Sequence, residues 1–183
     1  MAHYDLHTSQ LRDYVHKLKV GDTVNLTGTV YTARDAAHKK IVAAMEAGEP
    51  LPFPMQDAVI YYAGPTPAKP GQVIGSCGPT TAGRMDPFAP KLIANGLVCM
   101  IGKGVRNDKV AEAMKEHGCV YMAAIGGAGA IIAGSVKELE VVAYEELGCE
   151  SVKKLTVENF PAIVSMDAEG GTLYGDSPYR AQA

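Results

Sequence analysis

Short apolar runs alternate with glycine-, proline- and charge-rich stretches along most of this chain. The segment Thr23–Tyr31 alternates polar and apolar residues and is rich in β-branched side chains, which predicts a strand. Thr32 can cap a following helix, predicted over about Ala33–Ala47, and Gly48 marks its end. Apolar residues recur on one face of this helix, as expected for a helix that covers a core.

The middle of the chain continues the alternation of predicted strands and helices. The predicted strands are Ala58–Ala63, a short Gln72–Ser76, Leu97–Ile101 and Cys119–Ile125, with a loop over Gly64–Gly71. The predicted helices are one that starts near Pro79, one that runs from about Pro87 to Asn95, and one over Asn107–His117.

The C-terminal part is predicted to be mostly strand. After a glycine-rich loop over Gly126–Gly134, the strand-like runs are Leu139–Tyr144, Leu155–Val157, Ala162–Met166 and Thr172–Tyr174, the last two joined by a turn at Glu169–Gly171. Helices between strands in the middle and strands at both ends indicate an α/β domain with a mixed β-sheet. Residues 1–183 are expected to form a single domain with a loose tail from about Gly175.

The amino-acid composition argues against several classes of protein. Hydrophobic residues make up 47% and charged residues 20% of the 183 positions, which favours a full core over disorder. The net charge of −3 argues against a nucleic-acid-binding protein, which normally carries a basic face. No run reaches the ~18 apolar residues of a membrane span, and the polar start lacks a signal-peptide core. We therefore expect a cytoplasmic protein that binds neither nucleic acid nor membrane.

Four cysteines, Cys77, Cys99, Cys119 and Cys149, are widely separated and form no C-x-x-C pair. Zinc and iron–sulfur sites usually take at least two ligands from one local segment. The sequence therefore predicts that this chain ligates no metal or cofactor, and that the cysteines are buried free thiols.

Three cations occupy unusual places. Arg34 is predicted in the first turn of its helix, where a positive charge opposes the helix dipole, and Arg84 lies close to another helix start. Lys103 lies between two glycines just after a buried strand. Each alone is compatible with an ordinary surface cation. Together, two arginines and a lysine would suit a small dicarboxylate, because arginine binds carboxylates through two parallel hydrogen bonds.

Two threonines precede Arg84. If their segment is helical, Thr80 and Arg84 share one face, and the hydroxyl then lies beside the bound carboxylate. A hydroxyl is a poor base and would need a strong positive field to transfer a proton. The alternative is that Thr80 and Thr81 only cap the helix start.

His38 is a tempting metal ligand, but its helical neighbours at i−4 and i+4 are Arg34 and Val42, which are no ligands. A structural position is expected for it.

Around these cations and threonines, the chain resembles the β subunit, or C-terminal domain, of class I fumarases and L-tartrate dehydratases. The stretches that carry the resemblance, in the family's order, are Gly28–His38, Tyr61–Pro65, Gly78–Asp86 and Ile101–Gly104. The motif Gly-Pro-Thr-Thr-x-x-Arg-Met-Asp in the third stretch is the most specific of them. The resemblance covers the chain from Val20 to Gly175.

The resemblance implies a swivelling β/β/α domain of three layers. It implies that Arg34, Arg84 and Lys103 hold a dicarboxylate substrate and that Thr80 is the catalytic residue that transfers a proton. It further implies a hetero-oligomer with a cluster-bearing α subunit, for example two copies of each chain. That partner would hold a 4Fe–4S cluster, one iron of which is free to act as a Lewis acid in the reversible hydration of fumarate to S-malate.

Three rival interpretations accompany this one. The same chemistry on tartrate uses the same motifs. A phosphate or nucleotide site at Gly126–Ala130 is disfavoured, because the loop lacks both the P-loop and the dinucleotide-binding spacing. A non-enzymatic carboxylate-binding or interaction module stays open until a cluster-bearing partner is identified.

Overall fold

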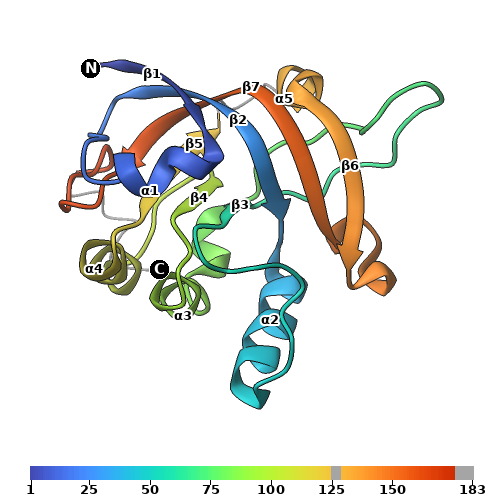
Figure 1. Ribbon diagram of the computed structural model, residues 1–183, viewed down its shortest axis with the longest axis horizontal. Coiled ribbons are helices and arrows are strands. Elements are labelled where there is room, and N and C mark those ends of the chain that lie inside the picture. The colour runs from blue at the N-terminus through green and yellow to red at the C-terminus, as the bar shows by residue number, and fades with distance from the viewer. Residues whose placement is uncertain (125–128, 176–183) are drawn as a thin grey trace.

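A seven-stranded mixed sheet organises the molecule, seen in a computed structural model that describes residues 1–124 and 129–175 (Figure 1). The strands are β1 (His3–His7), β2 (Thr23–Thr32), β3 (Val59–Tyr61), β4 (Cys99–Gly102), β5 (Val120–Ala124), β6 (Val136–Ala143) and β7 (Val152–Met166). Their order is β1-β2-β3-β4-β5-β7-β6, and β2 also pairs with β7, so the sheet closes on itself. Strands β1 to β5 run parallel, whereas β7 is antiparallel to β2, β5 and β6.

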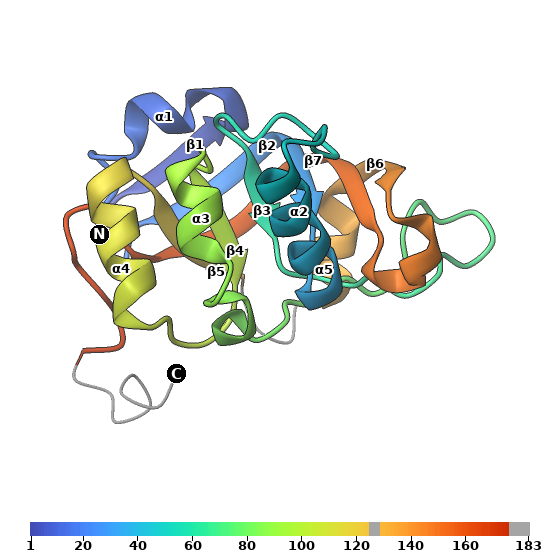
Figure 2. The ribbon, with the colours of Figure 1, turned by 90° about the horizontal axis from the view of Figure 1, so that it is seen from below.

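Helices connect the parallel strands. The α-helices are α1 (Leu11–Tyr14), α2 (Asp35–Ala47), α3 (Ala89–Ala94), α4 (Asp108–His117) and α5 (Gly129–Ser135), and the 3₁₀ helices are η1 (Thr8–Gln10), η2 (Ala82–Met85) and η3 (Glu145–Glu150). Helices α2, α3 and α4 lie in a row on one side of β3, β4 and β5 (Figure 2). Each helix in the described part of the chain is too short or too polar to span a bilayer.

Alternation along β3 divides the interior into two cores. Val59 and Tyr61 belong to a cluster shared with β2, β7 and α1, whereas Ile60 and Tyr62 belong to a cluster shared with α2, α3 and α4. Successive side chains of a strand point to opposite faces, so a strand buried on both faces reads as a continuous apolar run. The mixed α/β class predicted from the sequence is confirmed; the three-layer swivelling arrangement stays a prediction.

Several predicted boundaries were wrong for identifiable reasons. Strand β7 is one strand over Val152–Met166, where two runs were predicted around Pro161. Proline has no N–H for a ladder and signals a break, but this is where β7 changes its outer partner from β6 to β5. Strand β1 was missed because its polar sequence shows little of the apolar alternation that marks a strand. It is an edge strand that pairs with β2.

Two loop predictions also changed. The expected strand Gln72–Ser76 is part of a long connection without regular structure. Of the predicted loop Gly126–Gly134, residues 129–134 lie in helix α5, and residues 126–128 lie outside the described part of the chain. The expected loose tail falls almost entirely on residues 176–183, also outside it. The turn at Glu169–Gly171 is confirmed by an antiparallel bridge between Met166 and Thr172, but the predicted strand Thr172–Tyr174 is wrong, because the chain turns again directly after that bridge.

Candidate active site

The four predicted site residues follow three neighbouring parallel strands. Arg34 comes two residues after β2, and Lys103 directly follows β4. Thr80 and Arg84 lie in the segment that returns from the long connection after β3. Because the carboxyl ends of parallel strands meet at one edge of a sheet, this edge is the usual location of a ligand site in such folds.

Backbone hydrogen bonds join Thr80 to Lys103. The Thr80 amide donates to the Tyr62 carbonyl (2.6 Å), and the Thr80 carbonyl accepts from the Lys103 amide (3.3 Å). The Ala82 amide then donates to the Lys103 carbonyl (2.8 Å), which makes a parallel bridge between Thr81 and Lys103. Within the described residues, neither the Thr80 hydroxyl nor the Lys103 ammonium has a hydrogen-bond partner, so both are available to a ligand.

Gly102 allows this close approach. A Cβ at this position would lie 2.8 Å from Cδ2 of Tyr62 and 3.2 Å from the Cβ of Ala82. Real Cβ atoms essentially never come within 3.0 Å of another atom, so a larger residue would force the Tyr62 ring to shift and would press against Ala82. The glycine before Lys103 therefore has a packing reason as well as the predicted role of admitting a ligand.

Arg84 is held by a carboxylate from another element. Its Nε donates to Oδ2 of Asp35 (2.8 Å), and its Nη2 lies 2.6 Å from the same oxygen. Asp35 is the first residue of α2 and immediately follows Arg34. Through this pair the structure brings Arg84 beside the start of α2.

Arg34 differs from its predicted position by a small shift. It is the N-cap of α2, since the helix begins two residues later than expected, and Thr32 belongs to β2. Its side chain passes over Gly64, where a Cβ would lie 3.1 Å from Cδ of Arg34. Its Nε lies 3.3 Å from a carboxylate oxygen of Glu150, which is an ion pair without hydrogen-bond geometry, so this buried nitrogen has no hydrogen-bond partner.

The segment around Thr80 is not helical as predicted. Helix η2 begins only at Ala82, so Thr80 and Arg84 do not share a helix face. Thr81 takes the N-cap position, but its side chain makes no capping hydrogen bond, and the predicted capping role is wrong for it. The local reason is the pairing with Lys103, which keeps these residues extended.

The sequence did not predict the buried ion pair between Arg106 and Asp86. Nε of Arg106 donates to Oδ1 of Asp86 (2.6 Å), and the other oxygen of Asp86 accepts from the Asn107 amide (2.7 Å). Both side chains are almost fully buried, and the guanidinium lies against the rings of Tyr62 and Tyr121. The pair fixes the end of η2 to the loop that carries Lys103. The only available signal was Asp86, the last residue of the Gly-Pro-Thr-Thr motif.

His38 has the structural position that was expected. It is fully buried on α2, and its Nδ1 lies 2.9 Å from the Arg34 carbonyl, so Nδ1 carries the proton and donates. Its Nε2 is buried and has no hydrogen-bond partner among the residues that the structure describes. Burial lowers the pKa of His38 to about 4, which keeps the ring neutral at physiological pH.

No group of three or more histidine, cysteine or acidic residues gathers in the described part of the chain. Cys77, Cys99 and Cys119 are buried, as predicted, and burial raises the pKa of the Cys77 and Cys119 thiols to about 12. Cys149 is exposed, contrary to the prediction, because it lies in the surface helix η3.

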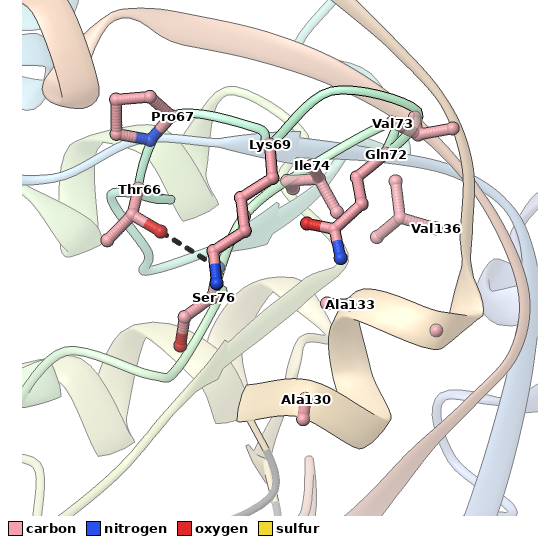
Figure 3. A pocket seen from close by; sticks show the side chains of 12 residues that line it. Thr66, Pro67, Lys69, Gln72, Val73, Ile74, Ser76, Ala130, Ala133 and Val136 are labelled. Atoms are coloured by element: carbon pink, nitrogen blue, oxygen red, sulfur yellow. Dashed lines mark hydrogen bonds between the residues drawn. The ribbon is translucent and has the colours of Figure 1, made fainter.

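A cavity of about 510 Å³ lies away from these residues. It is formed between the connection around Thr66–Ser76 and helix α5 (Figure 3). The Thr66 hydroxyl accepts a hydrogen bond from the Ser76 amide (2.9 Å) across its edge. None of Arg34, Thr80, Arg84 or Lys103 lines this cavity. Of the predicted site residues, Arg84 and Lys103 are exposed at the strand ends, whereas Arg34 and Thr80 are half-buried.

Several known proteins are similar in sequence to this chain. A fumarate hydratase class I (aerobic) from Escherichia coli is 45% identical over 85% of this chain, and fumarate hydratase 2 of Leishmania major is 43% identical over 90%. This chain spans only 29% of the length of each.

A shorter relative matches nearly end to end. The putative L(+)-tartrate dehydratase subunit beta of Methanocaldococcus jannaschii is 42% identical over 87% of this chain and 85% of its own length. The model of the family described as the fumarase C-terminus matches residues 1–177. With nearly the whole chain matched, this protein belongs to the fumarase C-terminus family.

Proposed function

We propose that this chain is the β subunit of a class I hydro-lyase that catalyses the reversible hydration of fumarate to S-malate. The observation that carries the proposal is the gathering of Arg34, Thr80, Arg84 and Lys103 at the carboxyl ends of adjacent parallel strands. Membership of the fumarase C-terminus family gives the reaction class.

In this proposal the cations bind the substrate and Thr80 moves a proton. Arg34, Arg84 and Lys103 hold the two carboxylates of fumarate and offset the charge that develops as a proton leaves the carbon. Glu150 and Asp35 lie beside the two arginines, so these five side chains carry one net positive charge before substrate binds. In this proposal the Thr80 hydroxyl, which has no hydrogen-bond partner within the described residues, exchanges a proton in this field.

The cluster belongs to a partner chain in this proposal. When bound there, a 4Fe–4S cluster would supply a Lewis acid for the hydroxyl and adjacent carboxylate of the substrate. The exposure of Arg84 and Lys103 supports a hetero-oligomer in which an α subunit covers the strand ends. The three-layer swivelling fold is part of the same proposal, as is a cytoplasmic location, which the buried free thiols support.

Tartrate is the second candidate substrate. The specific observation in its favour is the near end-to-end match with a putative tartrate dehydratase subunit beta, in which the alignment covers 87% of this chain and 85% of the relative. Both substrates are small dicarboxylates, so the cations serve either. Parallel assays of the assembled complex with fumarate, S-malate and L-tartrate decide between them.

Steady-state kinetics of variants in the assembled complex test the site. Thr80→Ala should lower kcat by about 100-fold or more with a much smaller change in KM, because a proton-transfer group acts mainly in the transition state. Arg84→Met should also raise KM by about 10-fold or more, because a carboxylate contact is lost from the bound ground state.

Thr81→Ala is the matched control. Since the Thr81 side chain makes no capping hydrogen bond, this variant should keep both activity and melting temperature close to wild type. Loss of turnover in Thr81→Ala with an active Thr80→Ala would reverse the roles of the two threonines. If both threonine variants are fully active, another residue transfers the proton.

A further inference from the structure

Asp35 holds Arg84 in an asymmetric way. Both Nε and Nη2 of the guanidinium reach one oxygen of Asp35, at 2.8 and 2.6 Å. The second oxygen, Oδ1, is buried and has no hydrogen-bond partner within the described residues. The pair joins residues that are 49 positions apart in the chain and lie on α2 and η2.

In the described part of the chain, this contact leaves the far edge of the guanidinium without a hydrogen-bond partner. Arginine presents its N–H groups in a rigid planar fork, with one edge formed by Nε and Nη2 and the other by Nη1 and Nη2. Asp35 occupies the first edge, and the Nη1–Nη2 edge can still bind a second carboxylate through two parallel bonds. A guanidinium held at one edge also loses less side-chain freedom when it binds at the other.

We propose that Asp35 is a positioning residue that orients Arg84 so that its free edge faces the substrate carboxylate. This inference rests on the proposed function and adds a residue to it. Asp35 touches no reacting atom in this proposal. Since Asp35 follows Arg34, the N-terminal end of α2 would supply one substrate contact directly and orient a second.

The alternative is an ordinary surface ion pair of little consequence. The chain offers a matched pair for comparison. Glu46, also on α2, accepts a hydrogen bond from Lys91 on α3 at 2.6 Å, with both side chains partly exposed as in the Asp35–Arg84 pair. Glu46→Ala therefore removes a comparable ion pair from the same helix away from the site.

Kinetics of the assembled complex with fumarate distinguish the two interpretations. Asp35→Ala should raise KM about 10-fold while kcat changes much less. The isosteric Asp35→Asn should raise it less, because the amide oxygen still accepts from Nε of Arg84. Glu46→Ala should leave both constants unchanged. Wild-type KM in both Asp35 variants would overturn the inference.

A double-mutant cycle tests whether Asp35 acts through Arg84. In the Arg84→Met background, Asp35→Ala should cause no further loss of kcat/KM. Losses that multiply fully would show that Asp35 acts by another route, and would overturn the inference. If the wild-type complex is inactive on both fumarate and tartrate, the proposed function itself fails, whereas an active wild type with silent Asp35 variants removes only this inference.

A measurement on the chain alone gives a readout besides activity. In NMR spectra of the wild-type chain, the Arg84 Nε–H should exchange with water slowly, and Asp35→Ala should speed its exchange several-fold. Glu46→Ala should leave it unchanged. Equal exchange in wild type and Asp35→Ala would show that Asp35 does not hold Arg84 in solution, and would overturn the inference.

Discussion

At the scale of single residues, buried polar groups fix the candidate site from behind. His38 lies in α2, and its Nδ1 donates a hydrogen bond to the carbonyl of Arg34, the N-cap of the same helix. This bond fixes the N-cap residue to the first turns of α2. The ion pair between Asp86 and Arg106 joins the end of η2 to the loop after Lys103. Breaking one partner of such a buried ion pair costs about 3–5 kcal/mol, because the other charge is left buried and unpaired.

His38 gives the protein a specific pH dependence of stability. Its pKa is about 4 in the folded chain because burial disfavours the charged ring, and it is about 6.5 in the unfolded chain. The unfolded state therefore binds the extra proton first as the pH falls. This contribution is constant above about pH 6.5, and below it stability is lost by about 1.4 kcal/mol per pH unit until about pH 4.

Urea unfolding of wild type and His38→Gln between pH 4 and 8 checks this prediction. The glutamine amide can still donate to the Arg34 carbonyl. The difference in unfolding free energy between the two proteins should therefore change only below about pH 6.5, by about 3 kcal/mol in total. Parallel pH profiles of the two proteins would contradict it.

At the scale of elements, the site is assembled from strand ends and the segments that follow them. Thr80–Ala82 adds a short parallel pairing beyond the end of β4, and the Thr80 amide bonds to the residue after β3. This pairing replaces the helical turn that the sequence predicted. It places the Thr80 backbone next to that of Lys103 without help from side-chain capping.

Gly102→Ala should disturb this pairing. The added methyl group would lie 2.8 Å from Cδ2 of Tyr62, too close for a buried ring to tolerate unchanged. Overpacking of this kind costs about 1–3 kcal/mol. We expect a lower melting temperature together with a loss of kcat, because Thr80 and Lys103 move apart.

Gly134→Ala is the control for a glycine with space around it. Apart from its chain neighbours and the backbone of its own helix, no atom in the described part of the chain lies within 4 Å of a Cβ at this helical position, so alanine should leave stability unchanged or raise it slightly. Thermal unfolding and kinetics of both variants give the comparison. Wild-type stability in Gly102→Ala would show that the segment relaxes without strain.

At the scale of the whole molecule, the buried apolar interior contrasts with the exposure of two of the proposed substrate-binding cations. Two apolar clusters fill the interior on either side of β3, β4 and β5, whereas Arg84 and Lys103 lie exposed at the strand ends. Solvent-exposed cations bind a small dicarboxylate weakly, because water competes with the carboxylates for their hydrogen bonds. A covering partner would exclude that water.

The chain alone should therefore be colourless and inactive. After anaerobic incubation with iron and sulfide, its visible absorbance should stay at baseline, because the described residues offer no group of ligands for a cluster. Mixed with a cluster-bearing α chain, it should elute in size exclusion as a hetero-oligomer with hydratase activity. A stable stoichiometric cluster on this chain alone would contradict the prediction.

The sequence by itself determined most strands, the helices α2 and α4, and the identity of the candidate site residues. These depend on short-range periodicity, caps and motifs, which a single segment contains. The tertiary structure decided that Thr80 is extended, that Asp35 holds Arg84, and that Arg106 is buried on Asp86. Each of these depends on partners 20 or more positions away, such as the 49 that separate Asp35 from Arg84. Local pattern contains no information about which distant carboxylate the fold brings to a given cation.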